Sequence, residues 1–211
     1  MARILITSGP TRQYLDPIRY LTNASSGRMG VALTQAALDI GHEVVVISGP
    51  VSIPYPTGAD VINVVSTHDM LVAAREAFQK SDGLIGAAAP CDYQPIKVAS
   101  QKIAKTGEPL KLHLVETTDI VATLGETKRR DQWVVGFALE TEDQRFRALA
   151  KMEKKSCDLM VLNGPAAMNS LENQVEVLNP DGTVVNSLLG TKTTVAQGIL
   201  QIIENRLIRQ P

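Results

Sequence analysis

The fold is constrained most by a series of short apolar runs that contain no polar alternation. Ile4–Ile6, Val44–Ile47 and Gly83–Gly86 are runs of this kind. Uninterrupted runs indicate strands that are covered on both faces, which is typical of parallel sheets. Helix patterns over Gly30–Ile40 and Asp143–Lys155 alternate with them. Alternating strands and helices, joined by right-handed crossovers, predict an α/β fold with a doubly wound, Rossmann-like, mainly parallel sheet.

The same alternation continues to the end of the chain. Further strands are predicted at Val61–Val65, Trp133–Phe137 and Asp158–Leu162, and further helices from Ser66 or Thr67 onward, over Ile120–Lys128 and through Val195, Ile199, Ile202 and Ile203. Before the last helix, Val175–Leu178 and Thr183–Val185 flank the turn sequence Asn179–Gly182. This arrangement predicts a C-terminal hairpin.

The segment Pro90–Thr118 interrupts the alternation. It contains scattered lysines and ends near Leu110–Leu114, where leucines alternate with Lys111 and His113. The alternation predicts an exposed strand with one buried face. Such a strand could form a flap over a ligand, or an edge used for dimerisation.

Composition limits the kinds of partner. The chain has 21 Lys and Arg against 22 Asp and Glu, and only 4% aromatic residues. This balance gives no overall field that would hold nucleic acid or an anionic membrane, and no stretch approaches the roughly 18 apolar residues of a membrane span. Cys91 and Cys157 are too few for a disulfide framework, which favours a reducing cytoplasm. The length of 211 residues predicts a single domain, 1–211.

In open α/β sheets, ligands bind beyond the carboxyl ends of the strands. The first loop there places hydroxyls and glycines before a helix, whose N–H groups and dipole favour an anion. The anion-binding candidates are Ser8, Gly9, Thr11, Ser25, Ser26 and Gly27. A plain helix cap is an equal alternative, because neither a Gly-x-Gly-x-x-Gly nor a Walker sequence is present. However, Arg12, Asp16, Arg19 and Asn23 crowd a loop far longer than a strand–helix turn needs.

The second loop, Gly86 to Tyr93, is rich in alanine. Small residues there would let a flat ligand lie against the backbone, with Asp92 available for hydroxyls or a metal; a tight turn poor in side chains is the alternative. Cys91 is interpreted as a buried small residue rather than a nucleophile, because no histidine lies near it in the sequence.

Two groups of lysines complete the candidates. Lys102 and Lys105 lie in the interrupting segment, where they could close over phosphates or simply be solvated. Lys151 and Lys155 are four residues apart on one helix face. A polyphosphate would relieve their mutual repulsion, although a solvated face is also plausible.

Together these loops resemble the phosphopantothenoylcysteine synthetase family, the ligase half of the bifunctional bacterial coenzyme A enzyme. The matching stretches are Thr7-Ser8-Gly9-Pro10-Thr11-Arg12, Leu15-Asp16-Pro17-Ile18-Arg19-Tyr20, Thr22 to Gly30, Cys91 to Pro95, Lys102 to Lys105, Val135 to Thr141, and Lys151 to Asn163. A match of this length spans nearly the whole chain. The flavin-dependent decarboxylase domain of the bifunctional enzyme has no counterpart in the sequence.

The resemblance implies a ligase that joins 4'-phosphopantothenate to L-cysteine. In the family's reaction the carboxylate attacks the α-phosphate of CTP with Mg²⁺ present, which releases pyrophosphate and leaves an acyl-cytidylate. The cysteine amine then attacks this mixed anhydride. The resemblance also implies a homodimer, and a separate decarboxylase that acts next. Metal ligands are not identified.

Site residues carry over by position. Asn23, Arg19 and Lys102 match the residues that hold the acyl-cytidylate or act in the chemistry. Matches to nucleotide contacts are Gly86, Ala87, Ala88, Asp92, Lys102, Thr118, Asp119, Ile120, Val121, Phe137, Lys151 and Lys155. The chain departs from the family at Ala104, where a lysine is usual, at Thr117-Thr118, which replaces Asn-Pro, and at Pro90-Cys91, which replaces Val-Ala.

Two other functions fit the sheet pattern. An NAD(P)-dependent oxidoreductase would need a glycine fingerprint after the first strand and an acidic residue after the second, where Ser48-Gly49-Pro50 stands instead. A noncatalytic nucleotide-binding subunit would not need Asn23 and Lys102, and both are present.

Overall fold

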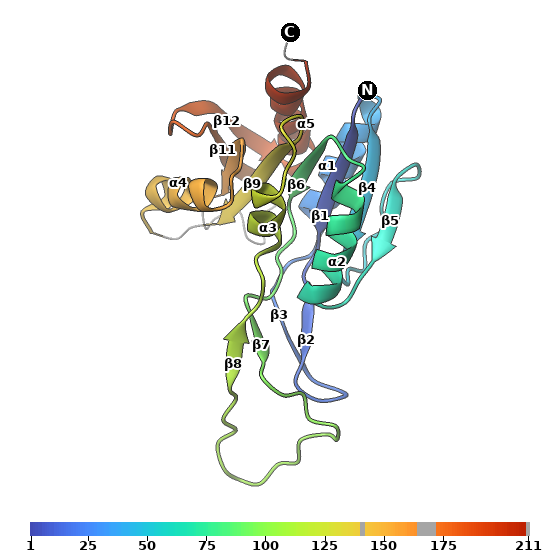
Figure 1. The fold of residues 1–211 in the computed structure, drawn as a ribbon, viewed down its shortest axis with the longest axis vertical. Helices are drawn as coiled ribbons and strands as arrows, with labels where there is room; N and C mark the ends of the chain where they lie inside the picture. Colours follow the sequence, from blue (N-terminus) through green and yellow to red (C-terminus); the bar gives the residue numbers. More distant parts are fainter. Residues whose placement is uncertain (140–141, 164–171, 210–211) are drawn as a thin grey trace.

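The computed structural model describes residues 1–139, 142–163 and 172–209 of the chain (Figure 1). Its main sheet has eight strands in the order β12-β11-β10-β9-β6-β1-β4-β5. These strands are β1 (Arg3–Ser8), β4 (Glu43–Ser48), β5 (Asp60–Asn63), β6 (Gly83–Gly86), β9 (Trp133–Leu139), β10 (Leu159–Asn163), β11 (Glu172–Leu178) and β12 (Val184–Thr191). All pairs from β5 to β10 are parallel, and β11 and β12 form an antiparallel hairpin. The predicted doubly wound sheet and C-terminal hairpin are confirmed.

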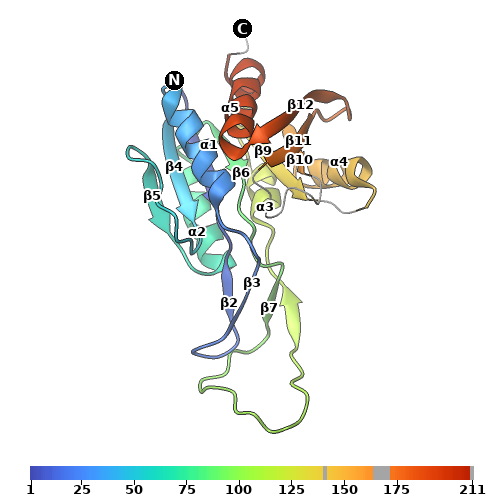
Figure 2. The ribbon, with the colours of Figure 1, turned by 180° about the vertical axis from the view of Figure 1, so that it is seen from behind.

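Helices cover both faces of the sheet (Figures 1 and 2). The helices are α1 (Arg28–Asp39), α2 (Thr67–Phe78), α3 (Ile120–Glu126), α4 (Gln144–Lys154) and α5 (Lys192–Ile203), which continues into the π-helix η2 (Glu204–Ile208). One core cluster lies between the sheet and α1 and α5, and the other between the sheet and α2, α3 and α4. In β1, Ile4 and Ile6 join the first cluster and Leu5 the second, all fully buried. The uninterrupted apolar runs therefore serve two cores.

The chain reverses direction across the sheet at β1. After β1 it adds β4 and β5 on one side, and then crosses back to place β6, β9 and β10 on the other side. The loops that leave β1 and β6 stay paired at first, because the Ala89 N–H donates to the Gly9 carbonyl at 2.9 Å, but they lead to helices on opposite faces of the sheet, α1 and α3. Such a switch point opens a crevice at the edge of a parallel sheet.

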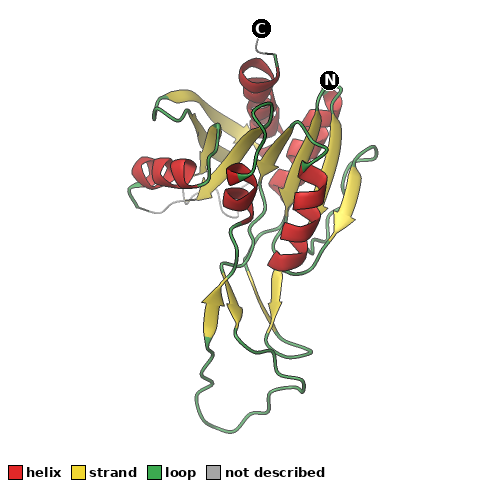
Figure 3. Ribbon diagram, in the orientation of Figure 1, coloured by secondary structure: helices red, strands yellow, loops and turns green. Residues whose placement is uncertain are grey.

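An arm of two small hairpins extends from this same end of the sheet (Figure 3). It consists of β2 (Arg12–Tyr14) with β3 (Tyr20–Thr22), and β7 (Tyr93–Pro95) with β8 (Leu114–Glu116), both antiparallel. The β2–β3 hairpin was not anticipated, because its polar sequence carries no strand periodicity. Its register is supported by the Arg12 guanidinium, which lies 4.5 Å from the centre of the Tyr20 ring.

The expected strand at Leu110–Leu114 is wrong in its position and in its burial. The strand begins only at Leu114, and residues 110–113 have no regular structure. Leu110, Leu112 and Leu114 are 59%, 40% and 39% exposed, so no face of the segment is buried within the chain. The alternation of leucines with polar residues identified neither the strand that pairs with this segment nor a layer that covers it.

The residues that cap or end helices predicted the helix boundaries more accurately. Ser66, rather than Thr67, caps α2, and it forms a capping box with Asp69. Gly41 has φ +86° directly after α1, a conformation that favours glycine. Across the described ranges, no helix is long and apolar enough to cross a membrane.

A substitution at Gly30 tests whether α1 must pack closely against β1. A Cβ atom at Gly30 would overlap the Ser8 side chain, which lies on β1. We expect Gly30→Ala to lower the free energy of unfolding by about 1–3 kcal/mol, although alanine is the better helix former by about 1 kcal/mol. The control is Gly198→Ala on α5, where the new methyl group meets only the Leu188 side chain, at 2.8 Å. Urea unfolding measures both, and a Gly30→Ala protein as stable as the wild type would show that α1 can shift without cost.

Candidate functional site

A cavity of about 290 Å³ lies at the carboxyl ends of β1, β6 and β9, at the switch point of the sheet. It is closed by the start of α3 and the end of α4. Of the residues singled out from the sequence, those that line it are Gly86, Ala88, Asp92, Thr118, Asp119, Ile120, Val121, Phe137 and Lys155. Four separate stretches of sequence therefore converge on one space.

Seven further lining residues were not among the predicted site residues, although all but Glu116 lie in the candidate loops or at the noted departures from the family pattern. They are Thr7, Pro90, Cys91, Tyr93, Glu116, Thr117 and Lys154. Thr117 is the most informative of them, because its hydroxyl donates to the Cys91 carbonyl at 2.6 Å and its N–H to the Asp92 carbonyl at 2.8 Å. These bonds join the loop after β6 to the loop before α3. The only signal in the sequence was the departure from the family pattern at Thr117-Thr118.

Gly86 allows α3 to approach the end of β6. A Cβ atom at Gly86 would lie 2.6 Å from Cγ2 of Val121, inside its van der Waals surface. Ala88 and Phe137 add small and flat surfaces beside it. Ala87 points elsewhere: it packs against the core under α1 and α5, and its N–H donates to the Thr7 carbonyl at 3.1 Å. The cavity thus has a wall with few side chains, suited to a flat ligand.

Asn23 reaches the same loop from the β3–α1 connection. Its side-chain N–H donates to the carbonyl oxygens of Ala89, at 3.2 Å, and Pro90, at 2.8 Å. Pro90 lines the cavity. Asn23 itself is exposed, so it lies beside the cavity and is bonded to the loop that lines it.

Lys155, one of two lysines in the cavity wall, pairs with Asp119 at the N-terminus of α3. Asp119 caps α3, because its Oδ1 accepts the N–H of Ala122 at 3.0 Å. Its Oδ2 lies 3.1 Å from Nζ of Lys155, whose side chain is 21% exposed. Both charges lie beside the cavity, so Lys155 presents an oriented ammonium to any anionic ligand.

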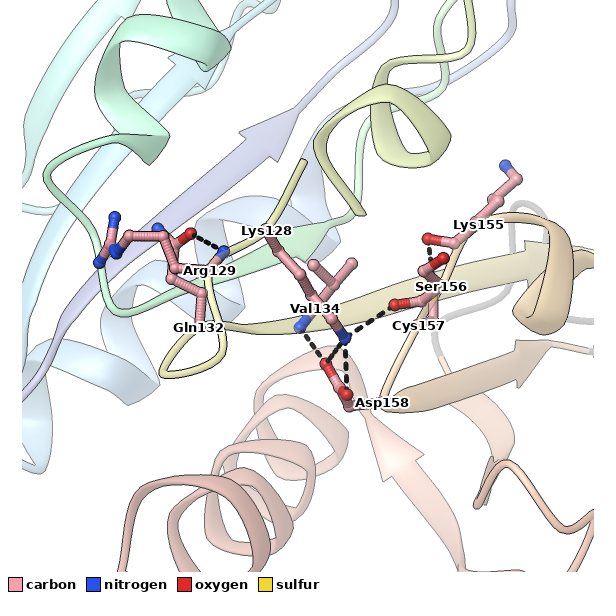
Figure 4. Close-up of polar contacts among 8 residues, drawn as sticks. All are labelled: Lys128, Arg129, Gln132, Val134, Lys155, Ser156, Cys157 and Asp158. Carbon is pink, nitrogen blue, oxygen red and sulfur yellow. Dashed lines mark hydrogen bonds and ion pairs between the residues drawn. The ribbon is translucent and has the colours of Figure 1, made fainter. Parts of the chain in front are cut away.

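Contacts with Lys128 hold the turn that follows Lys155 (Figure 4). Nζ of Lys128 donates to the carbonyl oxygen of Ser156 at 2.9 Å and to Asp158 Oδ2 at 2.6 Å. The same Asp158 oxygen accepts the N–H of Val134 at 2.7 Å, at the start of β9. Ser156 has φ +49°, a left-handed conformation that is uncommon outside glycine. Three elements are therefore joined at the base of Lys155.

The expected pairing of Lys151 with Lys155 is only partly reflected in the geometry. Lys155 is the C-cap of α4, and the second lysine in the cavity wall is Lys154. Within the described residues, Lys151 is not part of that wall. Glu140 and Thr141, which belong to the matched stretch after Phe137, lie outside the described residues.

The anion-loop candidates separate into buried and accessible residues. Ser8 and Thr11 are fully buried; the Ser8 hydroxyl accepts from Tyr55, and the Thr11 hydroxyl accepts the Cys91 N–H. Gly9 and Gly27 have φ +74°, and both lie against Val51. Ser25 and Ser26 line a second cavity of about 370 Å³, together with Arg12, Arg28 and residues 50–53. No side chain caps α1, and its first residue, Arg28, lines this second cavity.

The lysine segment is exposed at Lys102. The next residue, Ile103, is bound to the β2–β3 turn through Asp16 and Arg19. Nη1 of Arg19 donates to Asp16 Oδ2 and to the Ile103 carbonyl, both at 2.9 Å. Arg19 thus uses this nitrogen to connect two parts of the arm.

Cys91 is 4% exposed, and burial raises the pKa of its thiol. This confirms the interpretation of Cys91 as a buried small residue, because a thiol reacts as the thiolate. Burial also raises the pKa of Cys157, to about 12. In the described ranges no three His, Cys, Asp or Glu residues gather as a metal site.

Comparison with known proteins matches residues 1–207 to the family described as DNA/pantothenate metabolism flavoprotein C-terminal domain. The chain is 39% identical over 207 residues to the coenzyme A biosynthesis bifunctional protein CoaBC of Vibrio vulnificus, covering 95% of this chain and 51% of that protein. The CoaBC protein of Bacillus subtilis is 40% identical, with 95% and 50% covered. The chain therefore spans about half the length of these relatives.

A solved structure is similar throughout. The crystal structure of the C-terminal domain of a coenzyme A biosynthesis bifunctional protein CoaBC has a TM-score of 0.83 and 36% sequence identity. The match covers 99% of this chain and 96% of that one. The sheet and its helices are thus those of the C-terminal half of such proteins.

The contacts of Lys128 provide a test of the turn below Lys155. Lys128→Met removes an ion pair and a hydrogen bond to a carbonyl, and we expect the free energy of unfolding to fall by about 1.5–3 kcal/mol. Arg147 pairs with Glu142 in an exposed setting, with side chains 50% and 77% exposed. Arg147→Met is therefore the control, with an expected loss of about 0–1 kcal/mol for its ion pair. Equal losses in urea unfolding would mean that Lys128 is an ordinary surface cation.

Proposed function

The chain belongs to the DNA/pantothenate metabolism flavoprotein C-terminal domain family, and on this basis we propose that it is a phosphopantothenate–cysteine ligase. It would couple CTP cleavage, to CMP and pyrophosphate, to the joining of 4'-phosphopantothenate with L-cysteine. The observation that carries the proposal is the convergence of nucleotide-contact candidates from four stretches of sequence on one cavity. The coenzyme A relatives support the substrate class.

The reaction proceeds in two steps in this proposal. The carboxylate of phosphopantothenate attacks the α-phosphate of CTP, the bond to the β-phosphate breaks, and pyrophosphate leaves. The amine of cysteine then attacks the acyl carbon, loses a proton, and CMP leaves with the former carboxylate oxygen. Neither step needs a covalent bond to the protein, so orientation and charge neutralisation provide the catalysis.

The residues of the cavity suit these tasks. Gly86, Ala88 and Phe137 would accommodate the nucleoside against a surface with few side chains. Lys155, oriented by Asp119, would neutralise the phosphates. Asn23, beside the cavity, would hold the acyl-cytidylate by exchanging its carbonyl partners for the intermediate. Lys102 would approach from the arm as charge moves onto the departing pyrophosphate.

Mg²⁺ would accompany the triphosphate. Among the cavity residues, Asp92 and Glu116 supply carboxylate oxygens, the ligands that Mg²⁺ prefers when phosphates complete its shell. Because Asp119 already binds Ala122 and Lys155, it is less available. Bound Mg²⁺ would neutralise phosphate charge.

The arm is where a second copy of the chain would dock, in keeping with the homodimer implied by the family. Its exposed apolar side chains include Tyr93, Ile96, Val98, Leu110 and Leu112. We also propose a cytoplasmic location and a separate decarboxylase that consumes the product. An oxidoreductase is not favoured, because the glycine fingerprint is missing after β1.

The proposed function is tested by pyrophosphate release. We expect release with CTP only when phosphopantothenate is present, and formation of phosphopantothenoylcysteine only when cysteine is added. Replacement of CTP by ATP tests the choice of nucleotide. A protein that releases no pyrophosphate with either nucleotide would not be this ligase.

Lys102 is expected to act during the chemistry rather than in nucleotide binding. Lys102→Gln should therefore lower kcat by about 100-fold or more, with KM for CTP within about twofold of the wild type, because the contact forms as charge shifts in the transition state. Lys111→Gln is a control in the same exposed segment. A rise in KM with kcat intact would make Lys102 a phosphate anchor instead.

Substitutions of Lys155 and Lys151 are expected to change the Kd for CTP by different amounts. A charge-assisted contact contributes about 1.5–3 kcal/mol, so Lys155→Gln should raise the Kd for CTP by about tenfold or more. Lys151→Gln should have a smaller effect, since Lys151 is not in the cavity wall. Calorimetric titration of both single variants and the double variant measures this. The placement of the phosphates would be wrong if Lys151→Gln weakened CTP binding as much as Lys155→Gln.

A further inference from the structure

We propose that Asp16 is a positioning residue, which acts with Arg19 as a clasp that holds the Lys102 segment against the β2–β3 turn. The clasp is defined as Asp16 and Arg19 together with the backbone of Ile103. The proposal rests on the proposed ligase function only for the role of Lys102. The attachment of the segment by Asp16 is a property of the fold.

Asp16 is unusual because it is a fully buried carboxylate in a small hairpin. Its Oδ1 accepts the N–H groups of Ile18 and Arg19, both at 2.8 Å, which shapes the turn between β2 and β3. A buried charge is costly unless it is paired and fully hydrogen-bonded. Oδ2 supplies the remaining contacts, one inside the hairpin to Arg19 and one outside it to Ile103.

Oδ2 of Asp16 connects two parts of the chain that are distant in sequence. It accepts Nη1 of Arg19 at 2.9 Å and the N–H of Ile103 at 3.1 Å. The same Arg19 nitrogen donates to the Ile103 carbonyl oxygen at 2.9 Å. Both backbone polar groups of Ile103 are thus bound by one ion pair, and Lys102 is the preceding residue.

The nearest other attachment of the segment to the hairpin is the Ala99 N–H, which donates to the Leu15 carbonyl at 2.9 Å. Between residues 100 and 112, Ile103 is the only described residue that is hydrogen-bonded to a different part of the chain. The other bond within this range, from the Glu108 N–H to the Thr106 hydroxyl, is local. Ile103 is adjacent to Lys102, whereas Ala99 is three residues away, so the clasp is the attachment nearest to Lys102.

The charge of Asp16 is stable over the working pH range. Burial alone would raise its pKa, but the N–H groups of Ile103, Ile18 and Arg19, with the Arg19 guanidinium, lower it to about 2. The carboxylate stays ionised at neutral pH and keeps Arg19 in place. The Arg19 side chain, which the family resemblance assigns to the chemistry, thus supports Lys102 through Ile103.

Holding Lys102 in advance would serve catalysis by orientation. A lysine on a free loop must be ordered each time charge develops, whereas a lysine next to a fixed residue is partly ordered beforehand. Loss of the clasp should consequently reduce kcat. Nucleotide binding should be nearly unchanged, because no residue of the β2–β3 turn lines the cavity.

Hydrogen exchange of the Ile103 amide tests the attachment directly and needs no substrate. Asp16→Asn removes the negative charge and replaces one acceptor oxygen with an NH2 donor, and we expect exchange at Ile103 to accelerate about tenfold or more. Asp69→Asn is the matched control, because Asp69 also accepts a backbone N–H but lies on α2. Unchanged exchange at Ile103 in folded Asp16→Asn would overturn the proposal.

Kinetics test whether the clasp acts through Lys102. We expect Asp16→Asn to lower kcat about tenfold or more, with KM for CTP within about twofold. In the background of Lys102→Ala, Asp16→Asn should lower kcat no further, because the residue it positions is gone. Multiplicative effects would overturn the role of Asp16. A wild type without ligase activity would reject the proposed function, while the exchange experiment would still decide on the attachment.

A second variant covers the case in which Asp16→Asn does not fold. Ile103→Pro removes the N–H that Asp16 accepts from the segment and leaves the interactions inside the hairpin intact. It should show the same fall in kcat and the same lack of additivity with Lys102→Ala. A folded Ile103→Pro protein with the wild-type kcat would overturn the proposal.

Discussion

The structure depends on one topological constraint, the reversal of strand order between β1 and β6. The connections that follow β1 and β6 lead to helices on opposite faces of the sheet, α1 and α3, and this leaves space at the carboxyl ends of the two strands. Thr7 and Gly86 come to the same edge in this way, and they are paired in register. Phe137, α3 and the end of α4 close the remaining sides. The cavity is thus a consequence of connectivity, and side chains only adjust it.

In the proposed ligase, the chemistry would be divided between a base beside the cavity and the arm. At the base, Asp119, Lys155, Lys128 and Asp158 form ion pairs that also bind backbone groups, so each charge is tied to a secondary-structure element. In the arm, a single buried carboxylate connects the hairpin to the lysine segment. Binding and activation can therefore rest on different parts of the molecule, which is suited to a reaction in which the substrate charge moves between two steps.

Much of the fold follows from the sequence, because local and global signals agree there. The runs Ile4–Ile6 and Val44–Ile47 have few alternatives to buried parallel strands, and the residues after them mark the carboxyl edge without further information. The arm was not predictable in this way. The β2–β3 hairpin is held by Arg12 on Tyr20 and by the buried Asp16, which are contacts between specific side chains and leave no periodicity. Leu110–Leu114 shows the converse, a periodic pattern without a covering layer in the chain.

Among site residues, position along the sequence located Lys155 but could not distinguish Lys154 from Lys151, because both are within one helical turn.

The central claim is that the carboxylate of phosphopantothenate is activated by transfer of a nucleotide. The most direct test is a single-turnover reaction with phosphopantothenate labelled with ¹⁸O in its carboxylate, with CTP and cysteine, followed by mass spectrometry of the products. The account predicts one labelled oxygen in CMP, because the oxygen that attacks the α-phosphate leaves with it. Label in inorganic phosphate, with none in CMP, would show that the carboxylate is activated by phosphoryl transfer and would contradict the account.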